Sequence, residues 1–425
     1  MILTMINRVK GTYDVLPSEI KKWHYLESKI SEITSKYHYT EIRTPIMEYS
    51  GVFHRESELS DMVTKETYNF KDKGNRDVTL RPEGTAGIIR SYVENKLYAD
   101  NDLTKVYYLG PNFRYERPQK GRYRQFSQFG LEAIGTKSAL LDAEVISLAS
   151  EFIKSLGLKN VVVEINSIGD FESRSKYQKA LVTYLTPFAD KLSFDSKERL
   201  QKNPLRILDS KDPIDQELLV NAPKPIDYLN IESQEYFGDL KKYLECFKVE
   251  YKINDKLVRG LDYYSDTVFE VKANIKDFGA QNVLGGGGRY NDLVKELGGP
   301  DISAIGIAFG MERLLYALES ENLFPEELIS LDSYIITLSN DEKKYGTMVL
   351  QCLREAHFNV DIDFMNKSFK GQLKKALKEN SKTLIIIGEE ELKKNVVQLK
   401  NTKTEEQQEV NIKNLKEILK KVLEN

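Results

Sequence analysis

Two runs of alternating polar and apolar residues, joined by a short basic segment, stand out in the hydrophobic pattern of this chain. The first run is VYYLGPNFRYER, and Arg114 and Glu116 lie two positions apart near its end. Successive side chains of a β-strand point to opposite faces, so these two should project from one face. The second run, FSQFGLEAIG, brings Gln128, Gly130 and Glu132 to one face. The pattern therefore predicts a hairpin with one apolar and one charged face.

The connecting segment, PQKGRYRQ, predicts a long basic hairpin tip. It contains a proline, a glycine and three cations, Lys120, Arg122 and Arg124. Exposed strand faces are often charged, so the alternation alone does not require a binding site. Gly130 adds a further signal, because a glycine inside a strand leaves space for a group to lie flat on the sheet.

The segments before this hairpin predict a helix, a strand, a second hairpin and a second helix. Apolar residues recur at helical spacing between positions 19 and 37. YTEIRTPIMEYSGVF predicts a strand that Pro45 should bend or confine to a sheet edge. ETYNFKDKGNRDVTLRP predicts a hairpin. AGIIRSYVEN then predicts the second helix.

Glu83 and Thr85 come just before this second helix or in its first turn. A carboxylate is favourable near a helix N-terminus with or without a ligand. The same carboxylate would be a natural partner for a substrate ammonium group beside an amino-acid pocket. From the residues alone, the two interpretations of Glu83 stay open.

The segment LVRGLDYYSDTVFEV predicts a turn followed by a strand. Arg259 precedes the turn, and Tyr263 and Tyr264 begin the aromatic and β-branched run. Adjacent strand residues point to opposite faces, so we expect only one of the two tyrosines to line a given pocket.

Two glycine-containing segments near position 300 carry further candidate chemistry. LGGGGRYNDLV lacks the lysine and spacing of a phosphate loop, so it predicts either a close backbone approach to a ligand or a tight strand-to-helix turn. AIGIAFGMERLLYAL predicts a strand and then a helix with Arg313 in its first turn. The helix dipole disfavours a cation there, which indicates an anionic ligand.

Two further regions differ from the rest in character. Residues 171–255 are charged and helix-like, carry no chemistry-bearing cluster, and predict an insertion domain. From residue 331 to 425, short apolar runs alternate with helix-like segments, which predicts a separate α/β domain. Its lysine-rich helices are typical of solvated surfaces.

Composition bounds these expectations. A chain of 425 residues with 40% hydrophobic and 30% charged residues predicts two or three globular domains. The net charge of −3 gives no sign of a nucleic-acid partner, so any RNA contact must be local. Two distant cysteines and four scattered histidines exclude a zinc motif or a disulfide framework. Without an evident signal peptide or membrane span, we expect a cytosolic protein.

Several segments together resemble one family. FRYERPQKGRYRQFSQFGLE is similar to motif 2 of class II aminoacyl-tRNA synthetases in its histidyl-tRNA synthetase form. RGLDYY is similar to a peptide peculiar to histidyl-tRNA synthetases, and AFGMERLL is similar to motif 3. The segment around Pro45 resembles motif 1, which implies a homodimer. The resemblance runs from Gly11 nearly to the C-terminus, with the motifs in the family's order.

The resemblance implies an α+β fold. A class II catalytic domain over residues 1–325, with an antiparallel sheet flanked by helices, would be interrupted by the helical insertion at 171–255. An α/β anticodon-binding domain would follow at 331–425. The implied reaction joins L-histidine to ATP and transfers histidine from the adenylate to the 3′ end of tRNA(His). Mg²⁺ would accompany ATP, without zinc or an organic cofactor.

The resemblance also implies residue roles. The catalytic residues would be Arg259, Arg114 and Arg313. The ATP-binding residues would be Arg114, Glu116, Arg122 and Arg313. The histidine-binding residues would be Glu83, Thr85, Gln128, Glu132, Tyr263 and Tyr264.

Two other classes compete with this interpretation. A synthetase-like regulatory subunit would bind histidine without charging tRNA, but such paralogues typically degrade the ATP-binding motifs and lack the C-terminal domain. Here Arg114, Glu116, Arg259 and Arg313 are all in place, and a terminal domain is present. A simple RNA-binding module would not explain acidic and basic residues paired on one sheet face.

Overall fold

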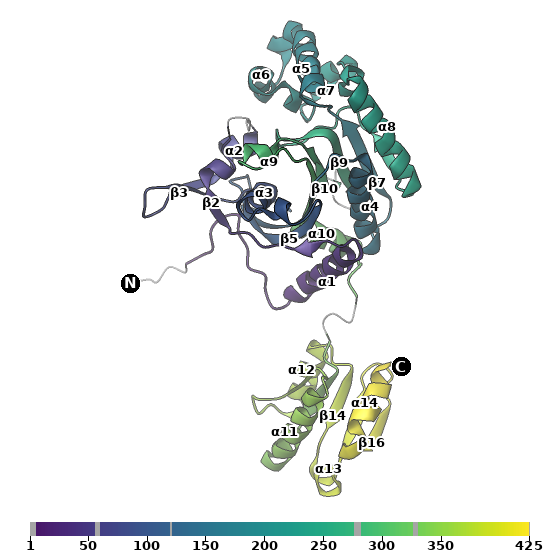
Figure 1. Cartoon of the computed structure of the whole chain (residues 1–425). Coiled ribbons are helices and arrows are strands. Elements are labelled where there is room, and N and C mark those ends of the chain that lie inside the picture. The colour runs from purple at the N-terminus through teal and green to yellow at the C-terminus, as the bar shows by residue number, and fades with distance from the viewer. Residues whose placement is uncertain (1–5, 56–59, 120, 276–281, 326–329, 425) are drawn as a thin grey trace, which may run out of the picture. The chain divides into compact units, whose positions relative to one another are not determined.

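The computed structural model describes residues 6–55, 60–119, 121–275, 282–325 and 330–424. The chain forms two compact units, Met1–Phe324 and Pro325–Asn425 (Figure 1). Lys120, one of the three predicted hairpin-tip cations, lies outside the described residues. No helix among the described residues is long and apolar enough to cross a membrane.

The first unit is built on a mixed eight-stranded sheet. Its central strands pair antiparallel, in the order β5-β6-β11-β10-β9-β7, and the short β1 and β8 add parallel at the two edges. In sheet order the strands are β1 (Thr40–Glu41), β5 (Thr104–Phe113), β6 (Gln125–Ile134), β11 (Ala304–Gly310), β10 (Val283–Tyr290), β9 (Ser265–Ala273), β7 (Val161–Ser167) and β8 (Tyr251–Ile253).

Helices cover one face of this sheet. The apolar residues of β6 alternate with polar ones, and Phe129 stacks on Phe309 of β11 at 5.6 Å between ring centroids. Phe152 packs edge-on against both rings. This core confirms the predicted apolar face of β6. The helices that contribute to it are α1 (Ile20–Lys36), α4 (Ala139–Ser155), α8 (Ile231–Cys246) and α10 (Met311–Ser320).

The predicted strand around Pro45 is wrong as one element. Thr40–Glu41 joins the large sheet as β1, whereas Met47–Tyr49 forms β2 of a separate three-stranded sheet. Proline has no N–H to donate, so the chain leaves one sheet and enters another around it. The other two strands of the small sheet are β3 (Tyr68–Lys71) and β4 (Asp77–Leu80), and these confirm the second predicted hairpin.

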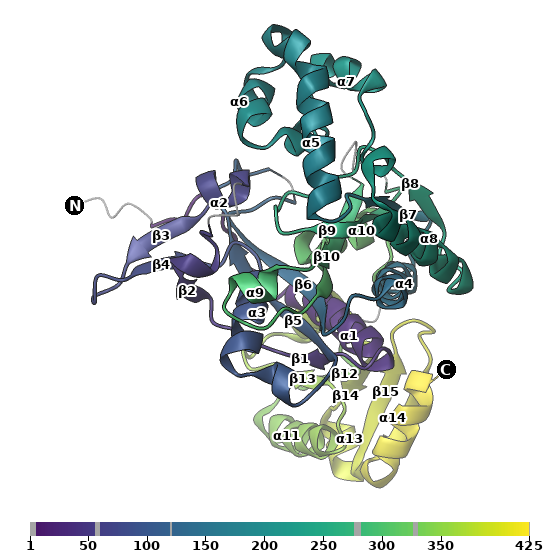
Figure 2. The same ribbon diagram turned by 45° about the horizontal axis from the view of Figure 1, so that its top comes forward.

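The remaining helices of the first unit fall into two groups. Near the small sheet lie α2 (Asp61–Lys65), α3 (Thr85–Glu94), which confirms the second predicted helix, and α9 (Leu293–Glu296). Within residues 171–255 lie α5 (Phe171–Leu185), α6 (Phe194–Lys202), α7 (Pro213–Leu218) and α8. Figures 1 and 2 show α5, α6 and α7 gathered to one side, whereas α8 lies along α4. The insertion domain stays a prediction, and its last part, α8 and β8, packs within the main body.

The second unit is an α/β domain with five strands in the order β13-β12-β14-β15-β16. The first three are parallel and the last two antiparallel: β12 (Ser333–Ile336), β13 (Val360–Ile362), β14 (Thr383–Ile386), β15 (Val396–Asn401) and β16 (Gln407–Asn411). Its helices are α11 (Asn340–Glu355), α12 (Phe369–Lys378), α13 (Glu389–Lys394) and α14 (Leu415–Glu424). Helices α11 and α14 pack on one face of the sheet and α12 on the other.

A fully buried ion pair ties the large sheet of the first unit to α4. Arg289 of β10 and Asp142 of α4 are both 0% exposed, and Arg289 Nε donates to Asp142 Oδ1 at 2.9 Å. Tyr236 of α8 and Thr267 of β9 also donate to Asp142. The carboxylate is therefore satisfied from three directions.

We expect Arg289→Met to lower the free energy of unfolding by about 3–5 kcal/mol, because it leaves a buried carboxylate without its cation. Urea unfolding followed by circular dichroism measures the loss. The matched control is Lys295→Met, which removes the cation of an exposed pair with Asp301 and should cost about 0–1 kcal/mol. Equal losses in the two variants would contradict the role of the buried pair.

Candidate active site

The sheet face opposite the helices has a floor of small residues. Residues paired directly across neighbouring strands point to the same face. One such row is Tyr108, Gly130, Ala308, Gly286 and Glu270, here called the Glu270 row. The Glu132 row, two residues along, contains Glu132, Gly306 and Gly288. The Gln128 row, on the other side, contains Gly110, Gln128 and Gly310. We call this surface the glycine face.

Side chains from other segments lie directly on this backbone floor. A Cβ atom at Gly130 would be 2.1 Å from the Tyr108 ring, and one at Gly286 would be 2.5 Å from the Arg259 guanidinium. A Cβ at Gly288 would be 2.7 Å from the Tyr264 ring. A side chain at any of these positions would therefore displace the group that lies on it. The space predicted above Gly130 exists, and Tyr108 fills it.

The glycine run is a central strand, so the strand-to-helix turn, one of the two predicted alternatives, is wrong, and a close backbone approach to a ligand stays a prediction. β10 pairs with β9 on one side and β11 on the other. Glycine is depleted in strands because it packs nothing, but here its lack of a side chain lets Arg259 and Tyr264 reach the sheet.

Glu132 lies at the centre of an acidic, hydroxyl-rich end of the glycine face. Its side chain is 0% exposed. Thr85 Oγ1 donates to Oε1 at 2.7 Å, and Tyr290 Oη donates to Oε2 at 2.5 Å. Burial raises the pKa of Glu132 to about 8, although both hydroxyl groups oppose the shift. The predicted residue is thus a desolvated carboxyl held from two sides.

Glu83 caps helix α3 beside this carboxyl. Its Oε2 accepts the Thr85 backbone N–H at 2.6 Å, and Oε1 accepts the Ala86 N–H at 2.8 Å. The structural interpretation of Glu83 is therefore confirmed, and its role toward a ligand stays a prediction. Each carboxylate oxygen keeps a second lone pair for another donor.

Tyr263 and Tyr264 lie side by side, which corrects the expectation that they face opposite ways. Their ring centroids are 4.7 Å apart. Both precede β9, so strand alternation does not apply to them. Burial raises the pKa of Tyr264 to about 12, while the nearby Arg259 opposes the shift. The Tyr263 and Tyr108 hydroxyl groups are buried without a hydrogen-bond partner among the described residues, so a polar ligand could satisfy them.

A cationic end lies beyond the Gln128 row, at the β5–β6 hairpin. Arg114 Nε donates to the Pro82 carbonyl oxygen at 2.8 Å. Glu116 lies 3.9 Å from Arg114 and 3.6 Å from Arg122 between the nearest charged atoms. Because β5 ends at Phe113, Arg114 and Glu116 are not on a strand face as predicted. They follow the strand into the hairpin, where their charges meet nonetheless.

Arg313 joins this end from the first turn of α10. Its Nη1 donates to the Val283 carbonyl oxygen at 3.0 Å. Burial, reinforced by the nearby Arg122 and Arg114, lowers the pKa of Arg313, whereas Glu116 and Glu270 oppose the shift. The predicted cations thus act on one another electrostatically.

Arg259 lies between the two ends. Its Nη1 donates to Glu270 Oε1 at 2.5 Å, and its Nε is buried without a partner among the described residues. Gln128 Oε1 accepts Asn112 Nδ2 at 2.6 Å in the next row. The predicted residues therefore gather on one sheet face, although their roles toward ligands stay predictions.

Sequence reasoning missed several residues of this face. Tyr108 and Tyr290 carry no motif, and their roles depend on contacts across strands. Glu270 could have been found, because alternation along β9 gives it a defined face. Glu312 also went unnoticed: it accepts Tyr13 Oη at 2.9 Å and the Ser127 N–H at 2.8 Å behind the hairpin. Burial raises its pKa to about 7.

The raised pKa of Glu132 makes stability depend on pH. Between pH 4.5 and 8 the folded protein keeps this proton and the unfolded chain loses it. The free energy of unfolding should therefore fall as pH rises through this window, by up to about 1.4 kcal/mol per pH unit. Glu132→Gln should flatten this part of the profile. Urea unfolding from pH 5 to 8 measures both proteins, and parallel profiles would contradict the assignment.

Comparisons with known proteins agree with this site. The sequence model described as Histidyl-tRNA synthetase matches residues 11–173 and 217–314, and the one described as Anticodon binding domain matches residues 332–422. The Histidine--tRNA ligase of Acholeplasma laidlawii is 60% identical over 416 residues, covering 98% of this chain and 99% of that protein. The corresponding Oceanobacillus iheyensis protein is 46% identical, with 97% of both chains covered.

Solved structures show the same relationship. The apo histidyl-tRNA synthetase of S. aureus superposes with a TM-score of 0.82 at 39% identity, covering 98% of this chain and 100% of that one. A Bacillus halodurans protein described as an ATP phosphoribosyltransferase regulatory subunit/histidyl-tRNA synthetase shares the fold, with a TM-score of 0.65 at 21% identity, covering 90% of this chain and 98% of that one. The near-complete matches above 30% identity decide the family: this chain belongs to the histidyl-tRNA synthetase family of histidine–tRNA ligases.

Proposed function

We propose that histidine and ATP bind end to end along the glycine face. The observation that carries the proposal is the order of groups along the strands. The Glu132 row holds the buried carboxyl and Tyr264, the Glu270 row holds Arg259, and the cations of the hairpin and α10 lie beyond the Gln128 row. Adjacent rows are two residues apart, about 7 Å, which is close to the length of one amino acid.

Histidine would occupy the end of the face near Glu132. Glu132 and Tyr264 would bind the imidazole, and Glu83, Thr85, Gln128 and Tyr263 would surround the ammonium and carboxylate groups. Thr85 and Tyr290 already fix the Glu132 carboxyl. A buried polar group placed for a ring N–H disfavours amino acids that cannot offer one, because it would then stay unpaired.

ATP would occupy the cationic end, with its α-phosphate next to Arg259. The first chemical step is attack of the histidine carboxylate on that phosphate, which gives histidyl-adenylate and pyrophosphate. Two anions must approach, so catalysis requires cations already in position. Arg114 would bind the α-phosphate, Arg313 the γ-phosphate, and Arg259 the oxygens where the two substrates meet.

Glu116 and Arg122 would complete the nucleotide site. Glu116 would hold the adenine edge, and Arg122 would close over the base from the hairpin. Mg²⁺ would neutralise the leaving pyrophosphate and would enter with the phosphates. The described residues contain no cluster of three or more acidic, histidine or cysteine side chains that could hold a metal ion. The proposal also includes a homodimer, which the resemblance to motif 1 implies.

Transfer RNA would contact the second unit at the carboxyl ends of its parallel strands. The helix after β12 covers one sheet face and the helix after β13 covers the other, so the two connections part at this edge. Ligands bind at such switch points in open α/β sheets. The exposed apolar side chains there are Leu338 (55%), Phe364 (73%), Met365 (73%) and Phe369 (39%).

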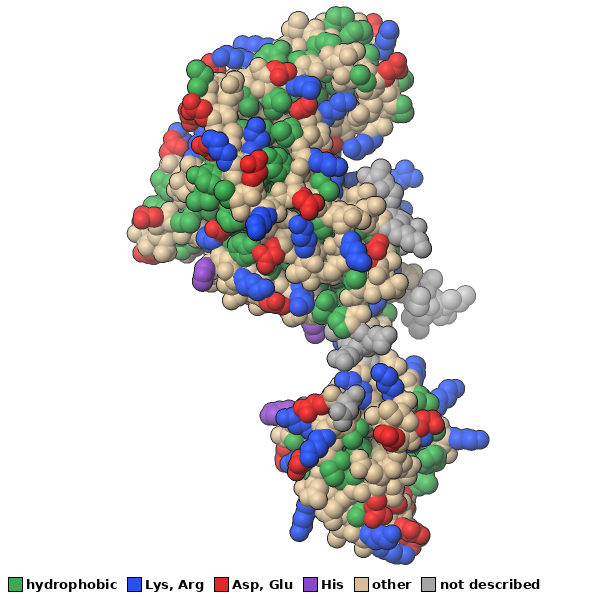
Figure 3. Space-filling view, turned by 90° about the vertical axis from the view of Figure 1, so that its right-hand side faces the viewer, with side chains coloured by type: hydrophobic (Ala, Val, Ile, Leu, Met, Phe, Trp, Pro, Cys, Tyr) green, Lys and Arg blue, Asp and Glu red, His purple; other side chains and the backbone are tan. Residues whose placement is uncertain are grey.

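The chemistry of this edge fits unpaired bases. Lys367 and Lys370 are exposed beside Phe364, and Lys343 hydrogen-bonds Asn366 in the same segment. Aromatic stacking combined with lysines is how proteins bind single-stranded nucleic acid. Basic and acidic side chains are interspersed on the face of the molecule in Figure 3. Because the net charge is −3, any RNA contact must depend on a local group of cations.

We expect Arg259→His to reduce histidine-dependent ATP–pyrophosphate exchange to background, because a shorter, partly neutral side chain cannot span the two anions. Histidine binding, measured by calorimetry, and the circular dichroism spectrum should change little. The control is Arg76→His, in an exposed turn, which should retain full exchange. An exchange rate near wild type would remove Arg259 from the mechanism.

We expect Phe364→Ser to raise the KM for tRNA in aminoacylation about 5- to 150-fold, since stacking on one base contributes about 1–3 kcal/mol. Pyrophosphate exchange, which needs no tRNA, should stay at the wild-type rate. Met348→Ser is the matched control, because Met348 is 64% exposed on α11. An unchanged KM for Phe364→Ser, or equal increases in both variants, would contradict the proposed tRNA edge.

A further inference from the structure

The loop Arg259–Tyr264, which carries the proposed histidine contacts, is held by side chains from the helical segment 171–206. We infer that Arg174 and Asn203 are positioning residues for this loop, so that the helical segment sets the geometry of histidine binding. The inference rests on the proposed function of Arg259 and Tyr264. It assigns a role to a segment in which the sequence shows no chemistry.

Arg174 fixes the backbone on both sides of Tyr263. It projects from α5, and its Nη1 donates to the carbonyl oxygens of Asp262 at 2.9 Å and Tyr264 at 3.0 Å. A backbone that is fixed at both positions also fixes the directions of the Cα–Cβ bonds of Tyr263 and Tyr264. The bonds to Arg174 are charge-assisted and therefore stronger than ordinary backbone hydrogen bonds.

Asn203 holds the same loop from the end of α6, and Arg206 lies beside the loop. Asn203 follows α6, and its Nδ2 donates to Asp262 Oδ1 at 2.6 Å. The Arg206 guanidinium lies 3.4 Å from the position of a Cβ on Gly260. Hydrogen bonds from this one segment therefore reach positions 262 and 264 of the loop.

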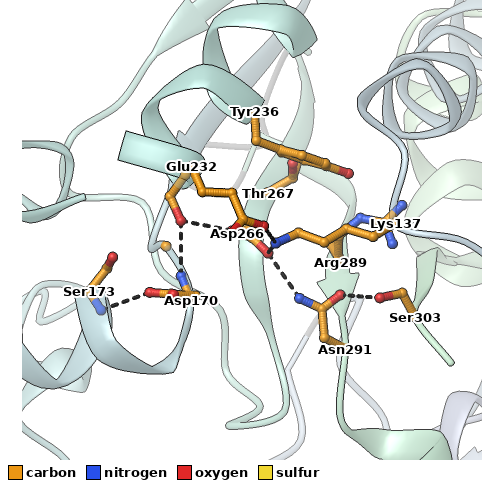
Figure 4. A network of polar contacts seen from close by, with 12 residues as sticks. Lys137, Asp170, Ser173, Glu232, Tyr236, Asp266, Thr267, Arg289, Asn291 and Ser303 are labelled. Atoms are coloured by element: carbon orange, nitrogen blue, oxygen red, sulfur yellow. Dashed lines mark hydrogen bonds and ion pairs between the residues drawn. The ribbon is translucent and has the colours of Figure 1, made fainter. Parts of the chain in front are cut away.

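The far end of the loop is anchored separately, to the main body. Asp266 adopts a left-handed conformation (φ +46°) and is 1% exposed. Its Oδ2 accepts Asn291 Nδ2 at 2.9 Å and lies 3.4 Å from Lys137 Nζ, as Figure 4 shows. Ser233 of α8 hydrogen-bonds the other oxygen. One end is thus fixed by the sheet, whereas the part carrying Tyr263 and Tyr264 depends on α5 and α6.

Hydrogen bonds to a buried carboxylate fix the start of α6, the helix that precedes Asn203. Asp215 is fully buried and accepts hydrogen bonds from the hydroxyl groups of Ser193, Ser196 and Ser210, at 2.7, 2.6 and 2.5 Å. These bonds join α6 to α7. Asn203, directly after α6, therefore follows a helix that is tied to α7.

These positions lie between the two matched ranges of the family's sequence model. The histidyl-tRNA synthetase sequence model matches residues 11–173 and 217–314, so Arg174, Asn203 and Arg206 fall between the matched ranges. The loop that they hold lies within the second range. The contacts therefore connect a stretch between the two matched ranges of that model to the residues proposed to bind the substrate.

Steady-state ATP–pyrophosphate exchange by the full chain tests the inference, with histidine and ATP varied separately. Arg174→Ala should lower kcat/KM for histidine at least about tenfold and change the KM for ATP less than about twofold, with little change in the thermal unfolding midpoint. Lys176→Ala is the matched control, because this exposed cation on the same helix forms an ion pair with exposed Glu172 and should leave the kinetics unchanged.

A charge exchange gives an independent readout. Asn203→Asp places a carboxylate against Asp262 and should also lower kcat/KM for histidine. Adding Asp262→Asn reverses donor and acceptor across the same contact, so the double variant should recover most of the loss. A structural role alone would not produce this recovery together with an unchanged KM for ATP.

The outcomes are separable. Wild-type kinetics in both Arg174→Ala and Asn203→Asp would overturn the inference. It would also be overturned if histidine and ATP kinetics fell in parallel with the unfolding midpoint and the double variant recovered nothing. A wild-type protein without histidine-dependent exchange would instead overturn the proposed function itself.

Discussion

The site depends on the absence of side chains along the middle of a sheet. A Cβ at Gly306 would lie 1.8 Å from Glu132 Oε2, and one at Gly130 would lie 2.1 Å from the Tyr108 ring. Glycine inside a strand costs about 0.5–1 kcal/mol relative to alanine. This sheet tolerates the cost because β6, β11 and β10 are paired on both sides and a continuous apolar core covers their other face. The same backbone that weakens each strand lets distant segments meet on it.

This constraint explains which features the sequence could predict. The alternation of β6, the helix before residue 37 and the strand-to-helix step at Arg313 are local patterns, and all three match the structure. The structures of the segment around Pro45 and of the glycine run do not follow from local patterns. In both cases the outcome depends on which strand lies next to the segment, and a single sequence does not record that.

The residues of the site divide in the same way into those that local patterns predict and those that depend on distant segments. Glu132 could be placed on a face by counting, but its hydroxyl partners Thr85 and Tyr290 lie 47 and 158 positions away. Tyr263 and Tyr264 were expected to diverge, because the rule for strands was applied to residues that precede the strand. The backbone carbonyl oxygens on either side of Tyr263 accept hydrogen bonds from Arg174 of α5, which lies far from any motif.

The arginines of the site show how a protein can hold cations ready for an anionic ligand. Arg114 and Arg313 each donate to a single backbone carbonyl oxygen, and Arg259 donates to one carboxylate oxygen of Glu270. A guanidinium has five N–H donors, so one bond fixes its direction and leaves the others for a ligand. A carbonyl oxygen has no net charge, so it lacks the Coulomb attraction that a phosphate oxygen adds to the hydrogen bond and competes weakly with a phosphate. Arg259 differs, since Glu270 already neutralises it in part. The residue proposed to meet both anions is therefore the one whose positive charge is partly offset by a carboxylate before either substrate binds, and this offset lowers the cost of holding a guanidinium beside the buried, hydroxyl-lined end of the face.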